Sequence, residues 1–357
     1  MAANQFTAAS MPGFWELSGE AQRGIGLPPF PSSTFNGHAT LATGCWPEHH
    51  GLVGNGFLDP GRGAIRFAGT AEFLLREPLW VAATRNGLAT AVYHWPCATG
   101  AWQGVTPWRL EAFSPGIPDR AALAFSERAL GDGGRLVMAY LSGTDPEGHR
   151  YGPDSDRVRE KLAALDAEVA PWVARMLDTY EGLRILLVAD HGMARMERCV
   201  DLRALLGQPA TVFAQGGSAL VALPASLTPA AKERLAASGL QVWRPEELPE
   251  AFHLRGSARL GSLVVQAPLG TWFTDADTPQ GREEERLRRQ GAHGYDASEP
   301  LMHAWLMVLG TGRRDPLPPT PLWDLAPTVA QWLGISWARK PDGVPLVALG
   351  NSRRRIA

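Results

Sequence analysis

Cysteine is scarce in this chain, which has 357 residues and only three cysteines. Cys45, Cys97 and Cys199 lie far apart, and no two of them have the spacing of a zinc-binding motif. So few cysteines also exclude the dense disulfide framework of small secreted domains. We expect three buried free thiols, because free cysteine behaves as a small apolar side chain.

Long apolar runs are also missing. No run reaches the roughly 20 residues that a membrane-spanning helix needs, so we expect no membrane span. Residues 1–15 lack the basic start and apolar core of a signal peptide, and the chain as written is expected in the cytoplasm. An upstream segment that carried a signal peptide would make export possible.

Neither sign of charge dominates, since 34 lysines and arginines oppose 36 aspartates and glutamates, for a formal net charge of −2. Such a chain has no general attraction for a nucleic-acid duplex or an anionic membrane. The hydrophobic fraction of 45% and the charged fraction of 20% are typical of a globular enzyme. The length fits one large α/β domain or two smaller ones, and the oligomeric state is not indicated.

What is present is an alternation of apolar runs and helical stripes. Residues 136–141 and 183–189 are apolar on both faces, which is typical of buried strands in a parallel sheet. Between them, apolar residues recur at spacings of three and four and predict an amphipathic helix, which Pro171 should kink or split. Strand, helix and strand in this order predict an α/β fold with a mostly parallel central sheet flanked by helices.

Residues 205–290 have a different pattern and predict a small inserted α+β lobe. The expected elements are strands at 219–223 and 263–266, a helix at 229–238, and a solvated helix face in the charged run 283–289. The core domain then comprises residues 1–204 and 291–357. It includes an apolar run at 304–309, a proline-rich loop at 315–321, and a helix at 326–333 that ends at Gly334.

Three clusters of aspartate and histidine carry the chemistry. They are Asp145 with His149, Asp190 with His191, and His293 within the segment Gly-Ala-His-Gly-Tyr-Asp. The first two clusters follow predicted strands, and the carboxyl ends of such strands meet at one edge of the sheet. Mixed aspartate and histidine ligands suit zinc, and they also bind manganese or iron.

A fourth feature is the segment 31–40, which opens a predicted helix that ends before Gly44. Hydroxyl side chains at a helix start are commonly N-caps. The same position suits a nucleophile that attacks a phosphate, because the free N–H groups and the dipole of the helix favour anions there. The residues by themselves leave both interpretations open.

These motifs together resemble the nucleotide pyrophosphatase/phosphodiesterase family of the alkaline phosphatase superfamily. One stretch of the chain resembles the nucleophile segment of the family. It consists of Phe30-Pro31-Ser32-Ser33-Thr34-Phe35, followed by His38, Thr40, Thr43-Gly44, Pro47-Glu48, His50-Gly51 and Asn55. Its remaining motifs resemble, in order, Asp145-Pro146-Glu147-Gly148-His149, Asp190-His191-Gly192-Met193 and His293-Gly294-Tyr295-Asp296. The similarity runs from about Met11 to Gly334 and implies an alkaline-phosphatase-like fold.

The resemblance implies a role for each matched residue. Thr34 would be the nucleophile that is transiently phosphorylated or nucleotidylated, Asn55 would donate a hydrogen bond to a phosphoryl oxygen, and Phe35 would lie beside the substrate. Two zinc ions would be bound. One would be held by Asp145, His149 and His293, and the other by Asp190, His191 and the Thr34 oxygen. The expected substrate is a small phosphate ester or a nucleotide.

The chain departs from the family in two places. The family has a further aspartate ligand at the end of a first core strand upstream of the nucleophile, but no aspartate precedes Asp59 here. Residues 1–30 show no apolar strand, and residues 11–24 predict a helix. We expect the first core strand to lie upstream of Met1 and the second zinc site to be incomplete as written; the alternative is a chain that has lost a ligand. Asn36-Gly37 stands where the family usually has Pro-Asn, which weakens the case for a nucleotide substrate.

Other functions remain open at this point. A phosphomonoesterase of the same superfamily would use the same residues, and a metal-deficient, non-catalytic member would only bind phosphorylated ligands. A sulfatase needs a Cys-x-Pro-x-Arg-like segment, which is absent around Cys45 and Cys97. A cofactor-independent phosphoglycerate mutase uses a serine and a large inserted domain, for which the chain is too short.

Overall fold

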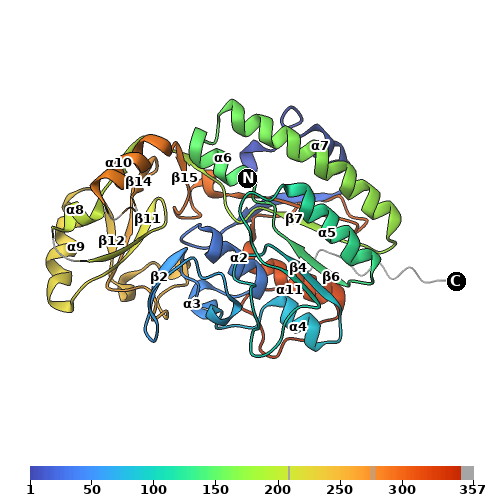
Figure 1. Cartoon of the computed structure of the whole chain (residues 1–357), viewed down its shortest axis with the longest axis horizontal. Coiled ribbons are helices and arrows are strands. Elements are labelled where there is room, and N and C mark those ends of the chain that lie inside the picture. Colours follow the sequence, from blue (N-terminus) through green and yellow to red (C-terminus); the bar gives the residue numbers. More distant parts are fainter. Residues whose placement is uncertain (208–209, 275, 277, 347–357) are drawn as a thin grey trace.

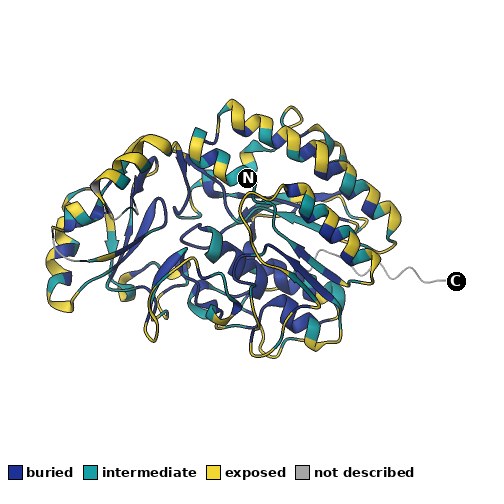
Figure 2. Ribbon diagram, viewed as in Figure 1, coloured by how far each residue is buried: buried dark blue, intermediate teal, exposed yellow. Residues whose placement is uncertain are grey.

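The computed structural model describes residues 1–207, 210–274, 276 and 278–346. The larger part is an α/β body in which helices cover central strands, and a smaller lobe extends from one side (Figure 1). Strands at the centre of the body are buried or half-buried, whereas the outer faces of the helices are exposed (Figure 2). This arrangement confirms the predicted α/β class with helices flanking a sheet.

Four strands form the first central sheet, in the order β17 (Thr320–Pro321), β1 (Gln22–Leu27), β16 (Ala304–Leu309) and β7 (Ile185–Val188). β16 is antiparallel to β1 and β7, whereas β1 and β17 are parallel. The apolar run at 183–189 therefore forms a central strand, as predicted, and the apolar run at 304–309 forms another.

Three parallel strands form the second central sheet, in the order β5 (Arg109–Glu111), β4 (Thr90–Tyr93) and β6 (Leu136–Ala139). Within the described residues no strand pairing joins it to the first sheet. The central layer thus consists of two separate sheets, whose facing edges are β6 and β7.

β16 shows how the helical layers enclose the first sheet, because side chains of a strand alternate between its faces. Its odd-numbered residues share a core cluster with residues of α1 (Pro12–Leu17) and α7 (Asp156–Thr179). Its even-numbered residues belong to a second core cluster, together with residues of α2 (Thr34–Thr43) and α11 (Leu325–Leu333). All six residues of the strand are buried, as expected for a strand covered on both faces.

Shorter elements surround these layers. The further helices of the body are α3 (Pro47–His50), α4 (Leu79–Arg85), α5 (Asp119–Gly131) and α6 (Thr144–Tyr151). The further strand pairs of the body are β2 (Gly56–Asp59) with β3 (Gly63–Arg66), and β8 (Ala194–Arg195) with β15 (Gly291–Ala292). Among the helices of the described residues, none has both the length and the apolar character required to cross a membrane.

A four-stranded antiparallel sheet lies within the interval 205–290, where we expect an inserted lobe. Its order is β10 (Thr211–Ala214), β11 (Ser218–Ala222), β13 (Leu263–Gln266) and β12 (Gln241–Trp243). The elements beside it are α8 (Leu202–Leu206), α9 (Thr228–Ala237), α10 (Pro279–Arg288), and the parallel pair β9 (Arg198–Val200) and β14 (Thr271–Phe273). The domain boundaries stay a prediction, and residues 347–357 of the expected core lie outside the described residues.

The amino-terminal region corrects one prediction. Residues 11–24 do not form a single helix, because α1 is short and the strand β1 follows it. β1 contains two glycines and polar residues, so no apolar run marks it, yet its backbone pairs on both sides. The glycines allow close packing, since a Cβ atom at Gly24 would lie 2.8 Å from Leu317 Cβ and one at Gly26 would lie 2.7 Å from Leu322 Cδ2. Pairing with distant segments, rather than a local apolar pattern, makes this strand.

Pro171 does not split the predicted helix, because α7 continues through it as one helix of 24 residues. The ring lies on the exposed face, and the carbonyl that loses its partner belongs to Ala167, which is also exposed and can bond to water. Val169 and Val173 beside the proline are buried in the core cluster that α7 shares with α1. Packing on the buried face therefore holds the helix together.

The three cysteines are free thiols, as predicted. Cys45 and Cys97 are buried, whereas Cys199 is only half-buried. Burial raises the pKa of Cys45 and of Cys199 to about 11, so neither is an ionised nucleophile at neutral pH.

Candidate metal-dependent active site

Asp145 and His149 lie one turn apart on α6, which begins just after β6 ends. Residues four apart lie on the same face of a helix. His149 Nε2 is accordingly 3.4 Å from Asp145 Oδ2. The local sequence alone thus places these two side chains together.

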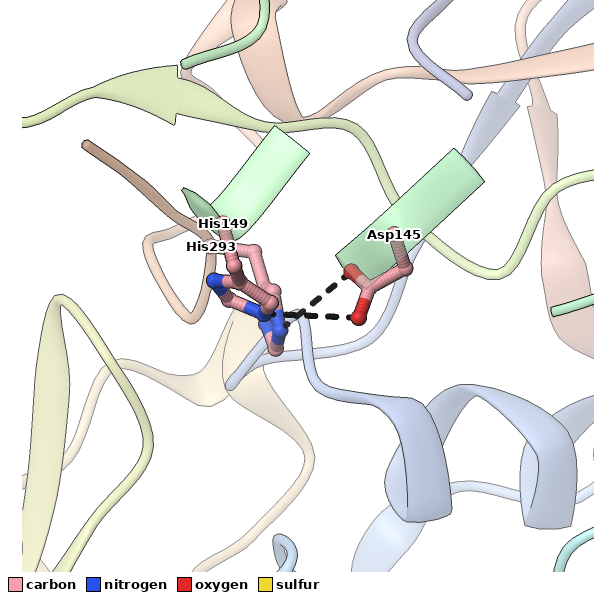
Figure 3. A group of neighbouring side chains, drawn as sticks. All are labelled: Asp145, His149 and His293. Atoms are coloured by element: carbon pink, nitrogen blue, oxygen red, sulfur yellow. Dashed lines mark ion pairs between the residues drawn. The ribbon is translucent and has the colours of Figure 1, made fainter. Parts of the chain in front are cut away.

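His293 reaches the same point from a distant part of the chain. It follows β15, and its Nε2 lies 4.0 Å from Asp145 Oδ1. Figure 3 shows both imidazole rings turned toward the Asp145 carboxylate. One ligand atom from each of the three residues lies within 4.8 Å of the others, which is the arrangement of a metal-binding group.

Asp190 and His191 form a second group, directly after β7. His191 Nε2 is 3.3 Å from Asp190 Oδ2 and 3.4 Å from the Thr34 hydroxyl oxygen. His38 also contacts Asp190, with 3.4 Å between Nδ1 and Oδ2. The two groups adjoin, because the His191 ring stacks on the His293 ring with 3.8 Å between centroids. The structure therefore brings all five predicted aspartates and histidines to one region.

The histidine rings are oriented by backbone carbonyls. The Nδ1 atoms of His149, His191 and His293 lie 2.8–2.9 Å from the carbonyl oxygens of Gly291, Gly192 and Ser32, respectively. A carbonyl only accepts hydrogen bonds, so each Nδ1 donates and each Nε2 keeps its lone pair for another partner. Fixing the second ring nitrogen in this way is typical of metal-binding histidines.

The carboxylates support the same interpretation. Within the described residues, Asp145 Oδ1 and Asp190 Oδ2 are buried without a hydrogen-bond partner. A buried carboxylate oxygen that lacks a partner is costly, and a bound cation would remove the cost. The first group offers three side chains and the second group offers two, and all of them are aspartates or histidines. Carboxylate oxygens and imidazole nitrogens are donors that zinc accepts, so these residues fit the zinc that the family resemblance implies.

Burial and neighbouring charges favour the protonation states that bind metals. Burial lowers the pKa of His293 well below its ordinary value, and His191 and His149 lower it further. Burial also lowers the pKa of His149, although Asp145 opposes this. Burial would raise the pKa of Asp190, but His191 and His38 outweigh it and keep that pKa below its usual range. Neutral imidazoles and ionised carboxylates are the forms required for metal binding.

Thr34 is the first residue of α2, and Ser33 occupies the N-cap position. The Ser33 side chain makes no cap hydrogen bond, so neither hydroxyl acts as a side-chain cap here. The Phe35 amide instead donates to Asn55 Oδ1 over 3.0 Å. Because Oδ1 is occupied, the Nδ2 hydrogens of Asn55 are the groups available to a ligand beside Thr34.

A pocket of about 230 Å³ opens beside these residues. Its lining includes Thr34, Asn55, Asp145, His149 and His293. Phe35 does not line this pocket; its ring lies 6.0 Å from that of Phe67, which does.

Further residues line the pocket that the sequence analysis did not single out: Arg66, Phe67, Phe213, Gln215, Phe273, Glu285 and Arg289. Glu285 and Arg289 belong to the run predicted as a solvated face. That prediction is wrong for these two, which are only partly exposed and face the pocket. A charge run contains no signal for which of its members turn inward.

Gln215 connects the lobe to the loop that carries Asn55. Its buried Oε1 accepts from the Asn55 amide over 2.6 Å, and its Nε2 donates to the Gly56 carbonyl over 2.9 Å. Two residues on, the Gly217 amide donates to the His293 carbonyl over 2.8 Å. One turn of the lobe therefore fixes both Asn55 and the His293 loop.

Fold and site together define an α/β protein whose residues Asp145, His149 and His293 form a candidate metal-binding group. The model of the family "Type I phosphodiesterase / nucleotide pyrophosphatase" matches residues 1–296, and the chain belongs to this family. The resemblance of the motifs is thereby confirmed.

Relatives in the family are distant in sequence. An uncharacterized pyrophosphatase/phosphodiesterase of Schizosaccharomyces pombe is 27% identical over 315 residues, covering 80% of this chain and 64% of the relative. The bis(5'-adenosyl)-triphosphatase ENPP4 of Bos taurus is 25% identical over 297 residues, covering 79% of this chain and 64% of the relative. The chain thus spans less than two thirds of the length of these relatives.

Solved structures of the family share the fold. Murine ectonucleotide pyrophosphatase/phosphodiesterase 5 superposes with a TM-score of 0.83 at 21% identity, covering 93% of this chain and 92% of that chain. An inactive variant of the murine protein in complex with AMP gives the same TM-score at 20% identity. These matches confirm the alkaline-phosphatase-like architecture.

Proposed function

We propose that this chain is a metal-dependent hydrolase of phosphoric diesters, of the nucleotide pyrophosphatase type, which acts through a covalent threonine intermediate. The observation that carries the proposal is the position of the Thr34 hydroxyl. It lies at the start of a helix, 3.4 Å from His191 Nε2, beside a pocket lined by a metal-binding group. Family membership supports the same class of reaction.

The proposed ligands divide into a complete group and an incomplete one. Asp145, His149 and His293 would hold one zinc ion. Asp190 and His191 would hold a second together with Thr34, with one carboxylate fewer than the family uses. Zinc, when bound, would make the threonine alkoxide accessible at neutral pH and stabilise negative charge on the leaving oxygen. We therefore propose that the first site is tight and the second is weak in this chain.

The residues of the chain then act as follows. Thr34 Oγ1 loses its proton to solvent and attacks phosphorus, and the bond from phosphorus to the leaving oxygen breaks. The leaving oxygen takes up a proton from solvent, and the phosphoryl group, which still carries its second substituent, stays on the threonine as a diester. Asn55 Nδ2 donates to a non-bridging oxygen, and the free N–H groups at the start of α2 attract the same negative charge. Water then attacks phosphorus, which releases the product and restores the Thr34 hydroxyl.

The pocket supports a phosphate ester that carries one further group. Its volume of about 230 Å³ lies below the roughly 300–1,000 Å³ that is typical of pockets for larger ligands. Arg66 and Arg289 supply positive charge and Phe67 an aromatic face, which together suit a phosphate joined to a planar group. The AMP complex of the murine neighbour supports a nucleoside as that group, because AMP is a phosphate joined to a nucleoside.

Replacing Thr34 tests the mechanism. Thr34→Ala should abolish hydrolysis of bis(p-nitrophenyl) phosphate, and Thr34→Ser should retain part of the rate because the hydroxyl survives. Because the Thr34 hydroxyl is not a side-chain cap, neither change should cost as much stability as the roughly 0.5–2 kcal/mol of a lost helix cap. Ser33→Ala is the matched control, because it removes the neighbouring hydroxyl, and it should be mild.

Mass spectrometry tests the covalent step, and a comparison of hydrolysis rates tests the substrate class. A brief reaction with the diester, an acid quench and mass spectrometry should locate the adduct on Thr34. An adduct on Ser33, or full activity in Thr34→Ala, would refute the assignment. A monoester rate above the diester rate would instead indicate a phosphomonoesterase, and no turnover of either would indicate a ligand-binding member.

A further inference from the structure

The pocket of about 230 Å³ beside Thr34 extends toward one of the two groups of aspartate and histidine. Its lining includes Asp145, His149 and His293 but, within the described residues, neither member of the Asp190–His191 group. Thr34 contacts that other group, 3.4 Å from an imidazole nitrogen. In an in-line displacement the leaving group departs opposite the attacking oxygen. A substrate attacked by Thr34 would therefore direct its leaving group into this pocket.

Two arginines line the pocket, and one of them is already bonded to the pocket wall. Arg66, the last residue of β3, donates from Nη2 to the Val212 carbonyl over 3.3 Å. Its guanidinium also lies over the ring of Phe213, 5.4 Å from the ring centroid. Arg66 is therefore part of the wall, with its orientation set by the lobe.

The guanidinium of Arg289 is held by weaker contacts. It lies over the ring of the buried Trp272, 5.3 Å from the centroid. Its Nη2 is 3.8 Å from Glu285 Oε1, which is longer than a hydrogen bond. Within the described residues this guanidinium makes no hydrogen bond to another residue. A stacked guanidinium keeps its N–H groups in the plane of the fork, so Arg289 can donate them to a ligand.

The backbone fixes Arg289 relative to the metal-ligand histidines. Arg289 directly follows α10, and its amide donates to the Glu285 carbonyl over 3.0 Å. The amide of the next residue, Gln290, donates to the His149 carbonyl over 2.7 Å. Three residues further along, the chain reaches His293. Arg289 is thus attached to the backbone of one ligand and lies just before another.

The charge of Arg289 acts on the metal-binding group. Burial is the main cause that lowers the pKa of His149, and the positive charge of Arg289 lowers it further. Glu285 offsets this charge only in part, because it is a single carboxylate and its Oε2 accepts from the Thr274 hydroxyl over 2.7 Å. Apart from the metal ligands, the charged residues in the described lining are two arginines and one glutamate. An anion therefore fits this pocket better than a cation does.

We propose that Arg289 is a specificity-determining residue that binds a negatively charged leaving group. The chain would then favour substrates whose leaving group is itself a phosphate over esters whose leaving group carries no charge in the bound substrate. This inference rests on the proposed function, because it requires Thr34 to attack phosphorus.

ADP illustrates the chemistry. Thr34 Oγ1 loses its proton to solvent and bonds to the α-phosphorus, and the bond from the α-phosphorus to the bridging oxygen breaks. Inorganic phosphate leaves with the bridging oxygen, while Arg289 stays protonated and donates to the phosphate oxygens. Water then hydrolyses the threonine ester and releases AMP. Because negative charge grows on the leaving phosphate as the bond breaks, a charge-assisted hydrogen bond to it strengthens in the transition state.

The test compares two substrates that transfer the same AMP group to Thr34. ADP has a phosphate as its leaving group, and the 4-nitrophenyl ester of AMP has an aryl group. Arg289→Ala should lower kcat/KM for ADP by about 10–100-fold, the range for a lost hydrogen bond to a charged group. It should change kcat/KM for the aryl ester little, since that leaving group offers the guanidinium no anion in the bound state.

Two further variants serve as controls. Arg288→Ala removes the neighbouring arginine, which is exposed and does not line the pocket, and it should leave the ratio of the two kcat/KM values unchanged. Arg289→Lys keeps the charge but loses the planar fork, so its ratio should lie between those of the native chain and Arg289→Ala. A fraction of unfolded protein lowers both rates by the same factor, so the ratio reports on the leaving group alone.

The outcomes separate this proposal from the proposed function. Equal losses for both substrates in Arg289→Ala would overturn the role of Arg289, although the hydrolase itself would stand. If the native chain hydrolyses neither substrate, the proposed function fails, and isothermal titration with AMP and α,β-methylene-ADP decides about Arg289. Tighter binding of the diphosphate that Arg289→Ala removes supports an anion site. Equal effects of the substitution on both ligands, or no binding of the diphosphate, overturn it.

Discussion

His50 shows how a single buried side chain can set a pH dependence. The Leu52 amide donates to its Nδ1 over 3.2 Å, and its Nε2 lies 3.0 Å from the Thr40 hydroxyl oxygen. Because an amide only donates, Nδ1 must be unprotonated, and the ring is neutral. Burial, together with smaller contributions from His49 and Arg259, lowers the pKa of His50 to about 3.

Stability should therefore fall as the pH falls from about 6.5 toward about 3, because the unfolded chain binds a proton there that the folded chain refuses. The loss from this residue should be about 1.4 kcal/mol per pH unit. Urea unfolding of the native chain and of His50→Asn between pH 7 and pH 4 measures it. Asparagine keeps an acceptor for the Leu52 amide but does not titrate. The free energy of unfolding of the variant should therefore change less with pH than that of the native chain. Identical slopes would contradict the prediction.

His293 is the residue on which the metal prediction depends, because it alone brings a ligand from a distant segment to Asp145 and His149. After dialysis the chain should retain closer to one zinc ion than two, since within the described residues only this group offers three aspartate or histidine ligands. His293→Ala should remove that ion. His303→Ala is the control, because His303 bonds to the Ala297 carbonyl outside the group. Metal analysis that finds two tightly held zinc ions would refute the deficiency of the second site.

The turn after β10 is the element that connects lobe and core. Gln215 bonds to the backbone on both sides of the Asn55–Gly56 peptide, and the next residues bond to the His293 loop. Gly216 has a φ of 93°, and a Cβ atom there would lie 2.2 Å from the His293 carbonyl oxygen. The turn thus tolerates little change in shape, and we expect it to position the donor that meets the phosphate.

Gln215→Ala should lower kcat by about 10–100-fold, the usual cost of losing a residue that orients a catalytic group. KM should change less, because the pocket walls remain. Gln215→Glu should recover part of kcat, since a carboxylate still accepts from the Asn55 amide although it cannot donate to Gly56. Gln241→Ala on the exposed face of β12 is the control. A loss of folded protein with unchanged kcat would show a purely structural role.

On the scale of the whole molecule, the metal-binding group joins α6 of the core to the loop after β15, 144 residues further along the chain from His149 to His293. A ligand that binds only the folded state stabilises it by mass action, by about 2.7 kcal/mol at 100 times its dissociation constant. A chelator should therefore lower the Tm by several degrees. Without chelator, the His293→Ala variant should already have the lower Tm that the native chain shows with chelator. Adding the chelator should not lower the Tm of the variant further. Equal responses of both proteins would place the metal elsewhere.

Much of the site could be predicted because its signals are local. Asp145 with His149 and Asp190 with His191 each lie within one turn of chain after an apolar strand, so sequence spacing alone brings each pair together. The runs at 136–141 and 183–189 were apolar on both faces, and both form central strands of the α/β body. Thr34 was assigned from the resemblance of its surrounding motif, and its catalytic role stays a prediction.

Only the tertiary structure revealed the features that depend on distant partners. β1 has no apolar pattern and exists because β16 and β17 pair with it. No sequence motif marks the pocket-lining residues of the lobe, such as Gln215, Glu285 and Arg289. They line the pocket because the lobe folds against the core. Local patterns report which side chains avoid water, whereas the pairing of backbone edges and the meeting of loops depend on contacts between segments far apart in the chain.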